Sequence, residues 1–148
     1  MYPKNLNLFQ KEKLVAPEIS LGGNFSYDLY GDFYSTTKVY GYIKKDEVKE
    51  GYYFWLALLN SKLFWFFIKN TGYILRGGYF TFKSNYIYPF PIPSNLDENL
   101  VKDIEANSEI LYKRKNDLNE IDYNYIENKI DNLINKLYKI APDEINLL

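Results

Sequence analysis

A run of twenty residues, Gly51–Asn70 (GYYFWLALLNSKLFWFFIKN), limits the folds open to this chain more than any other feature of its sequence. A membrane-spanning helix requires about 20 predominantly apolar residues, and this run approaches that requirement. Lys62 lies at its centre, however, where a charge costs about 2.5–3.5 kcal/mol on insertion scales. The run is therefore predicted to be a buried helix. Asn60 and Ser61 are interpreted as structural residues whose polar groups bond to neighbouring backbone.

The predicted helix carries signals at both ends. Glu47 and Glu50 lie near its start, where negative charge favours the helix dipole. Gly72 follows its end and is a natural C-terminal cap. Two helical stripes are apolar, one formed by Leu56, Leu59, Leu63 and Phe66 and the other by Trp55, Leu58 and Trp65 with Lys62 and Lys69. Apolar residues on both faces indicate a helix that other elements cover on most sides.

Short extended segments precede this helix. Strands are predicted over Lys13–Ile19, Phe25–Tyr30 and Asp32–Ile43, the last because it is dense in β-branched and aromatic residues. Residues 20–24 read as a loop by composition. Tyr30-Gly31-Asp32 is predicted to be a hairpin turn that joins the second strand to the third.

A further strand is predicted after the helix and a Gly77-Gly78 break. Residues 79–86 (YFTFKSNY) alternate in character, which places side chains on two faces of a strand. The polar face is predicted to carry Tyr79, Thr81, Lys83 and Asn85, and the core face Phe80, Phe82, Ser84 and Tyr86. Pro89, Pro91 and Pro93 then favour an extended exit.

The chain is predicted to be helical from Asn95 onward, as a pair of helices with apolar positions at helical spacing. The predicted fold class is therefore α+β: a small, mostly antiparallel sheet packed on a buried central helix, followed by a C-terminal helical pair. Residues 1–93 are predicted to form one domain, and residues 94–148 a helical extension that packs on it or on a partner.

Charge and aromatic residues divide at the same boundary. Residues 1–93 hold eleven Lys/Arg and seven Asp/Glu, whereas residues 94–148 hold seven and twelve, which together give the net charge of −1. Of the 28 aromatic residues, 24 precede residue 94. The two regions are therefore expected to have different functions.

The chain has no cysteine or histidine, which argues against thiolate metal sites and the usual general base. No secretion leader is recognised, so a cytoplasmic location is expected.

Several phrases of the sequence together resemble one family. They are KLVAPEIS (13–20), GDFYSTTKVYGYI (31–43), FWLALLNSKLFWFFIKN (54–70) and YIYPFPIP (86–93). The chain resembles the TaqI-like C-terminal specificity domain, the target-recognition part of type IIG restriction–modification enzymes and related adenine-N6 DNA methyltransferases.

That resemblance implies sequence-specific recognition of double-stranded DNA, with catalysis in a separate methyltransferase or nuclease domain or subunit. S-adenosylmethionine would bind in that catalytic part, with Mg²⁺ as a second candidate cofactor there. This chain shows no Gly-x-Gly cofactor loop after a strand and no adjacent prolines of a catalytic loop. No cofactor, metal site or catalytic residue is therefore expected within it.

Arg76 is the leading candidate for a base contact, because it precedes two glycines and arginine binds guanine edges in a bidentate manner. A plain surface arginine in a loop is the alternative. The other candidate DNA contacts are the polar face of the last strand (Tyr79, Thr81, Lys83 and Asn85) and the patch Ser35, Thr36, Thr37 and Lys38. The alternative for the strand face is a simple solvent-exposed face, and the alternative for the patch is an ordinary β-edge. Lys44, Lys45 and Lys49 suit phosphates in general.

Two other functions compete with DNA recognition. A protein-interaction module without DNA binding is favoured by the acidic helices, the pI near 5.5 and the single arginine in residues 1–93. A metal-dependent nuclease is suggested by Asp32, Glu47 and Lys49, but such triplets often arise by chance, and the acidic residues are better explained by the helix start.

Overall fold

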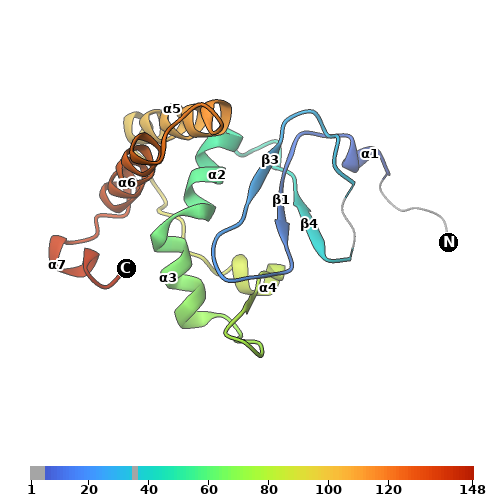
Figure 1. Cartoon of the computed structure of the whole chain (residues 1–148), viewed down its shortest axis with the longest axis horizontal. Coiled ribbons are helices and arrows are strands. Elements are labelled where there is room, and N and C mark those ends of the chain that lie inside the picture. Colours follow the sequence, from blue (N-terminus) through green and yellow to red (C-terminus); the bar gives the residue numbers. More distant parts are fainter. Residues whose placement is uncertain (1–5, 35–36) are drawn as a thin grey trace.

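A computed structural model gives the structure of the chain and describes residues 6–34 and 37–148. Its elements are α1 (Leu6–Phe9), β1 (Lys13–Pro17), β2 (Ile19–Ser20), β3 (Ser26–Asp28), β4 (Val39–Tyr42), α2 (Tyr52–Asn60), α3 (Lys62–Thr71), β5 (Phe80–Thr81), α4 (Ser84–Ile87), α5 (Glu98–Arg114), α6 (Glu120–Leu137) and α7 (Pro142–Ile145). Helices α2 and α3 run through the middle, with the strands on one side and α5 and α6 on the other (Figure 1). The predicted α+β architecture is confirmed.

Strand β1 is the centre of a three-stranded antiparallel sheet, with β3 and β4 at its edges. Leu14 pairs with Tyr27 of β3 and with Tyr42 of β4. Leu14 and Ala16 are each 2% exposed, so alternate residues of β1 enter the core, as strand geometry requires. A second, smaller antiparallel sheet pairs β2 with β5.

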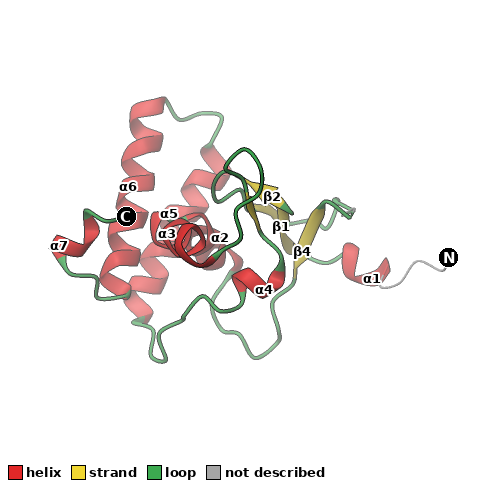
Figure 2. Ribbon diagram, turned by 90° about the horizontal axis from the view of Figure 1, so that it is seen from below, coloured by secondary structure: helices red, strands yellow, loops and turns green. Residues whose placement is uncertain are grey.

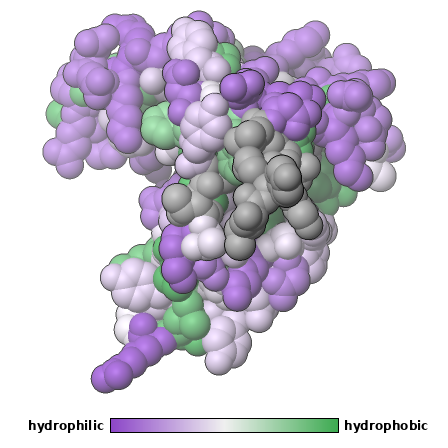
Figure 3. Space-filling view, turned by 90° about the vertical axis from the view of Figure 1, so that its right-hand side faces the viewer, coloured by the Kyte–Doolittle hydropathy of each residue, from purple (hydrophilic) through white to green (hydrophobic). Residues whose placement is uncertain are grey.

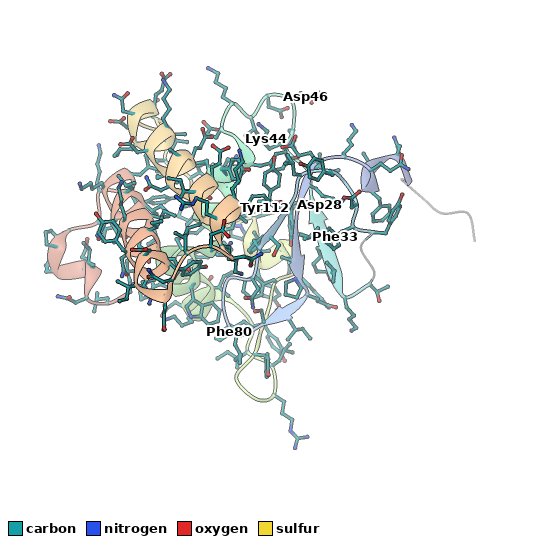
Figure 4. The ribbon with its side chains drawn as sticks, turned by 45° about the horizontal axis from the view of Figure 1, so that its top comes forward. Asp28, Phe33, Lys44, Asp46, Phe80 and Tyr112 are labelled. Atoms are coloured by element: carbon teal, nitrogen blue, oxygen red, sulfur yellow. The ribbon has the colours of Figure 1, made fainter. Side chains whose placement is uncertain are left out.

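The predicted hairpin at Tyr30–Asp32 is wrong, because β1 lies between β3 and β4. Within the described residues of the predicted strand Asp32–Ile43, which are 32–34 and 37–43, only Val39–Tyr42 forms a strand. The cause is the buried carboxylate of Asp28, which accepts hydrogen bonds from the backbone N–H of Asp32 (2.9 Å) and Phe33 (3.0 Å) and so curls the chain into a loop. Asp28 and Phe33 lie close together in Figure 4.

The same carboxylate binds the ammonium group of Lys13, and both side chains are 2% exposed. Burial alone would raise the pKa of Asp28. The hydrogen bonds from Lys13, Phe33 and Asp32 outweigh burial and lower that pKa, so the carboxylate stays ionised.

The predicted central helix is two helices, α2 and α3, because the helical conformation is interrupted at Ser61. Ser61 adopts an extended backbone conformation (ψ 158°), and its hydroxyl accepts from the N–H of Phe64 (3.1 Å), which makes it the N-cap of α3. Asn60 bonds through its amide to both the N–H and the C=O of Phe25, each at 2.9 Å. The interpretation of Asn60 and Ser61 as structural is therefore confirmed. Among the described residues, no helix is long and apolar enough to cross a membrane.

The break changes which residues of the run are buried. Phe54, Leu58, Phe64 and Ile68 are fully buried, whereas Leu59, Leu63 and Phe66 of the predicted stripe are only partly so. The helical spacing counted along α2 does not predict which residues of α3 are buried, because the extended residue Ser61 changes the direction in which the side chains of α3 point relative to those of α2. Each fully buried Phe, Leu or Ile contributes roughly 1.5–3 kcal/mol, so these positions hold the helices to the sheet.

The C-terminal helices α5 and α6 pack on this core and also cap the helices within it. Ile104 and Ile134 are fully buried in the shared core. The carboxylate of Glu105 accepts from the N–H of Gly51 (2.5 Å) at the start of α2, and that of Asp131 from the N–H of Lys62 (3.0 Å) at the start of α3. The helical pair therefore packs on the front of the chain; the division into two domains at residue 94 stays a prediction.

Candidate DNA interface

A hairpin follows α3 and projects from the body of the molecule; we call residues 73–80 the tip hairpin. Ile74 pairs with Phe80 at its base, and the N–H of Leu75 donates to the C=O of Tyr79 (2.7 Å). Phe80 marks where the hairpin leaves the core in Figure 4, and the space-filling view shows it as the narrow projection at the foot of the molecule (Figure 3).

Arg76 lies at the tip of this hairpin. The N–H of Gly78 donates to the C=O of Leu75 (3.1 Å), so Arg76 and Gly77 are the two central residues of a tight turn. Gly77 and Gly78 have φ values of +88° and +80°, which favour glycine, as a type II turn requires at its third position. The Arg76 side chain is exposed, and no carboxylate within the described part of the chain pairs with it. The turn presents a planar five-donor group to the outside.

Aromatic and aliphatic side chains flank the arginine on the hairpin. Tyr73 is 58% exposed, Ile74 59% and Tyr79 42%. The Tyr79 ring lies beside Gly77, where an added Cβ would approach it to 3.4 Å. The tip hairpin thus offers one cation together with flat, partly apolar side chains.

A second group of charges lies where the two sheets meet; we call Glu18, Lys38 and Lys83 the sheet-end cluster. The N–H of Glu18 donates to the C=O of Lys38 (2.9 Å), and the C=O of Glu18 accepts from the N–H of Phe82 (2.7 Å). These backbone bonds bring three distant segments together. The Glu18 carboxylate then lies 3.6 Å from the Lys38 ammonium and 3.5 Å from that of Lys83.

A shallow hollow of about 320 Å³ adjoins this cluster between β4 and α4, two elements that Figure 2 shows side by side. Its lining residues are Tyr40, Gly41, Tyr42, Lys83, Ser84, Asn85 and Tyr88. Tyr42 donates its hydroxyl to the C=O of Phe82 (3.1 Å), and burial raises the pKa of that hydroxyl above its ordinary value of 10. The hollow therefore combines aromatic faces, a lysine and an amide, which suits stacking, charge and directional hydrogen bonding.

The predicted strand Tyr79–Tyr86 is mostly wrong. Only Phe80–Thr81 is a strand, and α4 begins at Ser84 because the C=O of Lys83 accepts from the N–H groups of Tyr86 and Ile87. Phe80 and Phe82 are buried as predicted. Ser84, predicted on the core face, is exposed.

Thr81 is a correction among the predicted DNA contacts. It is only 5% exposed, in a strand that pairs with β2 and, through Phe80, with Ile74 at the base of the tip hairpin. Its buried hydroxyl has no hydrogen-bond partner within the described structure. Thr81 therefore faces the interior and not a ligand.

The other predicted site residues fall into two places. Arg76 and Tyr79 lie on the tip hairpin, whereas Lys38, Lys83 and Asn85 lie at the sheet-end cluster and its hollow. Thr37 is exposed in the turn before β4. Ser35 and Thr36 lie outside the described residues, so the structure does not test them.

Sequence reasoning missed Glu18, Tyr40 and Tyr88. Glu18 is the single acidic residue of the run 13–20, a weak signal that could have drawn attention to it. Its lysine partners, however, are 20 and 65 positions away in the chain.

The three residues of the nuclease alternative do not converge on a metal site in the structure. Asp32 belongs to the loop that Asp28 organises, whereas Glu47 and Lys49 are exposed in the segment before α2. In residues 6–34 and 37–148, no three side chains of the types His, Cys, Asp and Glu gather as metal ligands.

Comparison with known families identifies the region that carries both surfaces. Residues 2–92 match the family described as the TaqI-like C-terminal specificity domain, a span that covers more than half of the chain. The tip hairpin and the sheet-end cluster both lie within this span, whereas α5, α6 and α7 follow it. No curated protein matches the chain.

Proposed function

The chain belongs to the TaqI-like C-terminal specificity domain family, and on that premise we propose that it selects the DNA target of a restriction–modification enzyme through its tip hairpin and sheet-end cluster. Membership implies DNA target recognition in general. The finer proposal concerns which residues contact the duplex and what each of them does.

The observation that carries this proposal is the presentation of Arg76. A projecting turn fixed by two left-handed glycines holds an exposed guanidinium without a carboxylate partner in the described chain. The major groove of B-DNA, about 12 Å wide, admits a two-stranded ribbon. Arginine at such a tip can bind O6 and N7 of guanine together, a contact that gives about 1–3 kcal/mol of discrimination. Tyr79 can pack beside the sugar or base.

The sheet-end cluster is proposed to hold the phosphate backbone. Lys83 and Lys38 have side chains 54% and 75% exposed, and a lysine ammonium suits a phosphate as a point charge. Asn85 and Thr37 add polar groups near these lysines. Such contacts position the protein on the duplex, whereas base contacts specify the sequence.

The catalytic step is proposed to belong to an adenine-N6 methyltransferase, in the same polypeptide or in a separate subunit of a type II system. S-adenosylmethionine, and Mg²⁺ where the system also cleaves, would bind in that component. A cytoplasmic location fits such a system, because it acts on intracellular DNA.

The proposed interaction module without DNA binding gains no specific support from the fold. The apolar sides of the acidic helices are covered by α2 and α3, with Ile104, Ile130 and Ile134 buried. Two of their carboxylates, from Glu105 and Asp131, cap helices of the same chain. Part of the surface of the acidic helices, which motivated this alternative, therefore makes contacts within the chain itself.

Selection from a pool of random duplexes tests the proposed function. The chain, together with its methyltransferase component, is expected to enrich one motif. The Arg76→Ala variant should still enrich it but lose information at one guanine position. Arg114, the chain's other arginine, is exposed at the end of α5, so Arg114→Ala is the matched control and should leave the motif intact. Failure of the wild type to enrich any motif would contradict target recognition.

A further inference from the structure

Glu18 differs from its two lysine partners in how firmly it is held. Its backbone N–H and C=O are both bonded, to Lys38 and Phe82, at the junction of the two sheets. Its side chain is 14% exposed, against 75% for Lys38 and 54% for Lys83. The carboxylate is therefore a fixed anion, whereas each lysine has a long side chain that can reorient.

The stability of the fold does not explain this carboxylate. Pairs between such a carboxylate and an exposed lysine contribute little to folding, because the lysine charge is screened by solvent and its long side chain must be ordered. The Glu18 oxygens, however, occupy the position next to both ammonium groups that a phosphate oxygen would take. A DNA backbone that contacts Lys83 must compete with an anion that is already present.

We propose that Glu18 limits the sequence-independent affinity of this surface by competing with DNA phosphates for Lys83 and Lys38. This inference rests on the proposed function and identifies a further residue that governs selectivity. When phosphate contacts are weakened, binding depends more on contacts with base edges, which alone distinguish one sequence from another. Glu18 thus acts against binding to duplexes that offer only their backbone.

Removing the charge from Glu18 gives a direct test on a random duplex with the 148-residue chain. The Glu18→Gln variant keeps the shape of the side chain and should bind a labelled random duplex more tightly than the wild type. Each phosphate newly engaged steepens the slope of log K against log salt by about 0.9. Between about 50 mM and about 200 mM KCl, the loss of affinity should therefore be about three- to fourfold larger than for the wild type if one lysine is released.

Two controls separate competition from a general effect of charge. Glu98→Gln makes the same change in net charge at the exposed start of α5 and should leave binding unchanged. In the double variant Glu18→Gln/Lys83→Ala, most of the gain should disappear. Glu18→Ala provides a second removal of the charge, and thermal unfolding checks that each variant is folded.

The possible outcomes distinguish this inference from the proposed function. A gain for Glu18→Gln that requires Lys83 supports competition. A wild type that binds in a salt-dependent manner, with Glu18→Gln or Glu18→Ala no tighter, overturns the role of Glu18 alone. An equal gain for Glu98→Gln overturns it too, in favour of net charge. Absence of salt-dependent binding by the wild type and every variant overturns the proposed function as well.

Discussion

The acidic helices and the basic front of the chain use charge in opposite ways. In the helical pair, Glu105 and Asp131 direct their carboxylates at the backbone N–H groups that begin α2 and α3. In the front, Lys38, Lys83 and Arg76 extend outward, and only Glu18 among the described carboxylates pairs with any of them. The charge division in the sequence thus corresponds to a division between carboxylates that support the fold and cations that are proposed to bind DNA.

This contrast explains why a chain with a net charge of −1 is still suited to a polyanion. Carboxylates at helix N-termini satisfy N–H groups that lack an intrahelical partner, and they favour the helix dipole. Their charge is partly offset there. Lys38, Lys83 and Arg76 extend outward at the sheet-end cluster and the tip hairpin, so they can act locally although the net charge of the chain is not positive.

The largest expected effect concerns Lys13, a lysine of the front whose side chain is buried. Lys13→Met removes the buried partner of Asp28 and leaves that carboxylate uncompensated, so the free energy of unfolding should fall by about 3–5 kcal/mol. Urea denaturation measures the change. Lys83→Met, at an exposed position, is the control and should stay within about 0.5 kcal/mol of the wild type. Equal losses would break the distinction between inward and outward lysines.

Lowering the pH should weaken the same buried pair. The pKa of Asp28 is lower in the folded chain than its ordinary value of 3.8, so its contribution to stability is present above that value. It is lost as the pH falls below about 4 toward the folded pKa. Compared with Asp28→Asn, the wild type should therefore lose more stability between about pH 6 and about pH 3 in urea denaturation. Parallel pH profiles for the two proteins would contradict this.

A smaller effect is expected at the break between α2 and α3. Ser61→Ala removes the hydroxyl that caps α3 and should destabilise the chain by about 0.5–2 kcal/mol, as measured by thermal or urea unfolding. Ser84→Ala at the exposed start of α4, where Lys83 is the N-cap, should change stability by less. An unchanged midpoint for Ser61→Ala would mean that its cap is dispensable.

The smallest expected effects compare the helix-capping carboxylates directly with Lys83. Glu105→Gln and Asp131→Asn should each lower stability by about 0.3–1 kcal/mol while random-duplex binding stays the same. Lys83→Ala should do the reverse, with stability nearly unchanged and a salt slope that is smaller by at most about one, because Glu18 already competes with phosphates for Lys83 in the wild type. Unfolding curves and duplex titrations on the same three variants give both readouts. A variant that changes both the stability of the chain and its binding to random duplex would contradict this separation between folding and DNA contact.

Features that depend on neighbouring residues, such as turns and buried helices, could be predicted from the sequence. Gly77 and Gly78 indicated a break, and both adopt positive φ values. The apolar run indicated buried helix, but Ser61 divides it, because a capping hydroxyl competes with helix continuation only where tertiary contacts such as those of Asn60 support the break.

Long-range contacts determined the rest. The order β3-β1-β4 depends on Asp28 binding Lys13 and curling the next five residues, which strand propensity does not encode. Thr81 alternates as a polar surface residue should, yet the fold buries its side chain. The Glu18–Lys83 pair joins residues 65 positions apart, so it could not be predicted from the sequence without the fold.

Arg76 is proposed to contact a base edge, and a paired titration measures that contact. Wild type, Arg76→Ala and Arg114→Ala, each with the methyltransferase component, are titrated with the selected motif and with a scrambled duplex at two salt concentrations. Arg76→Ala should lose about 1–3 kcal/mol of binding to the motif and much less to the scrambled duplex, whereas Arg114→Ala should match the wild type. A motif-to-scrambled affinity ratio that Arg76→Ala leaves unchanged would show that the tip hairpin does not read the sequence.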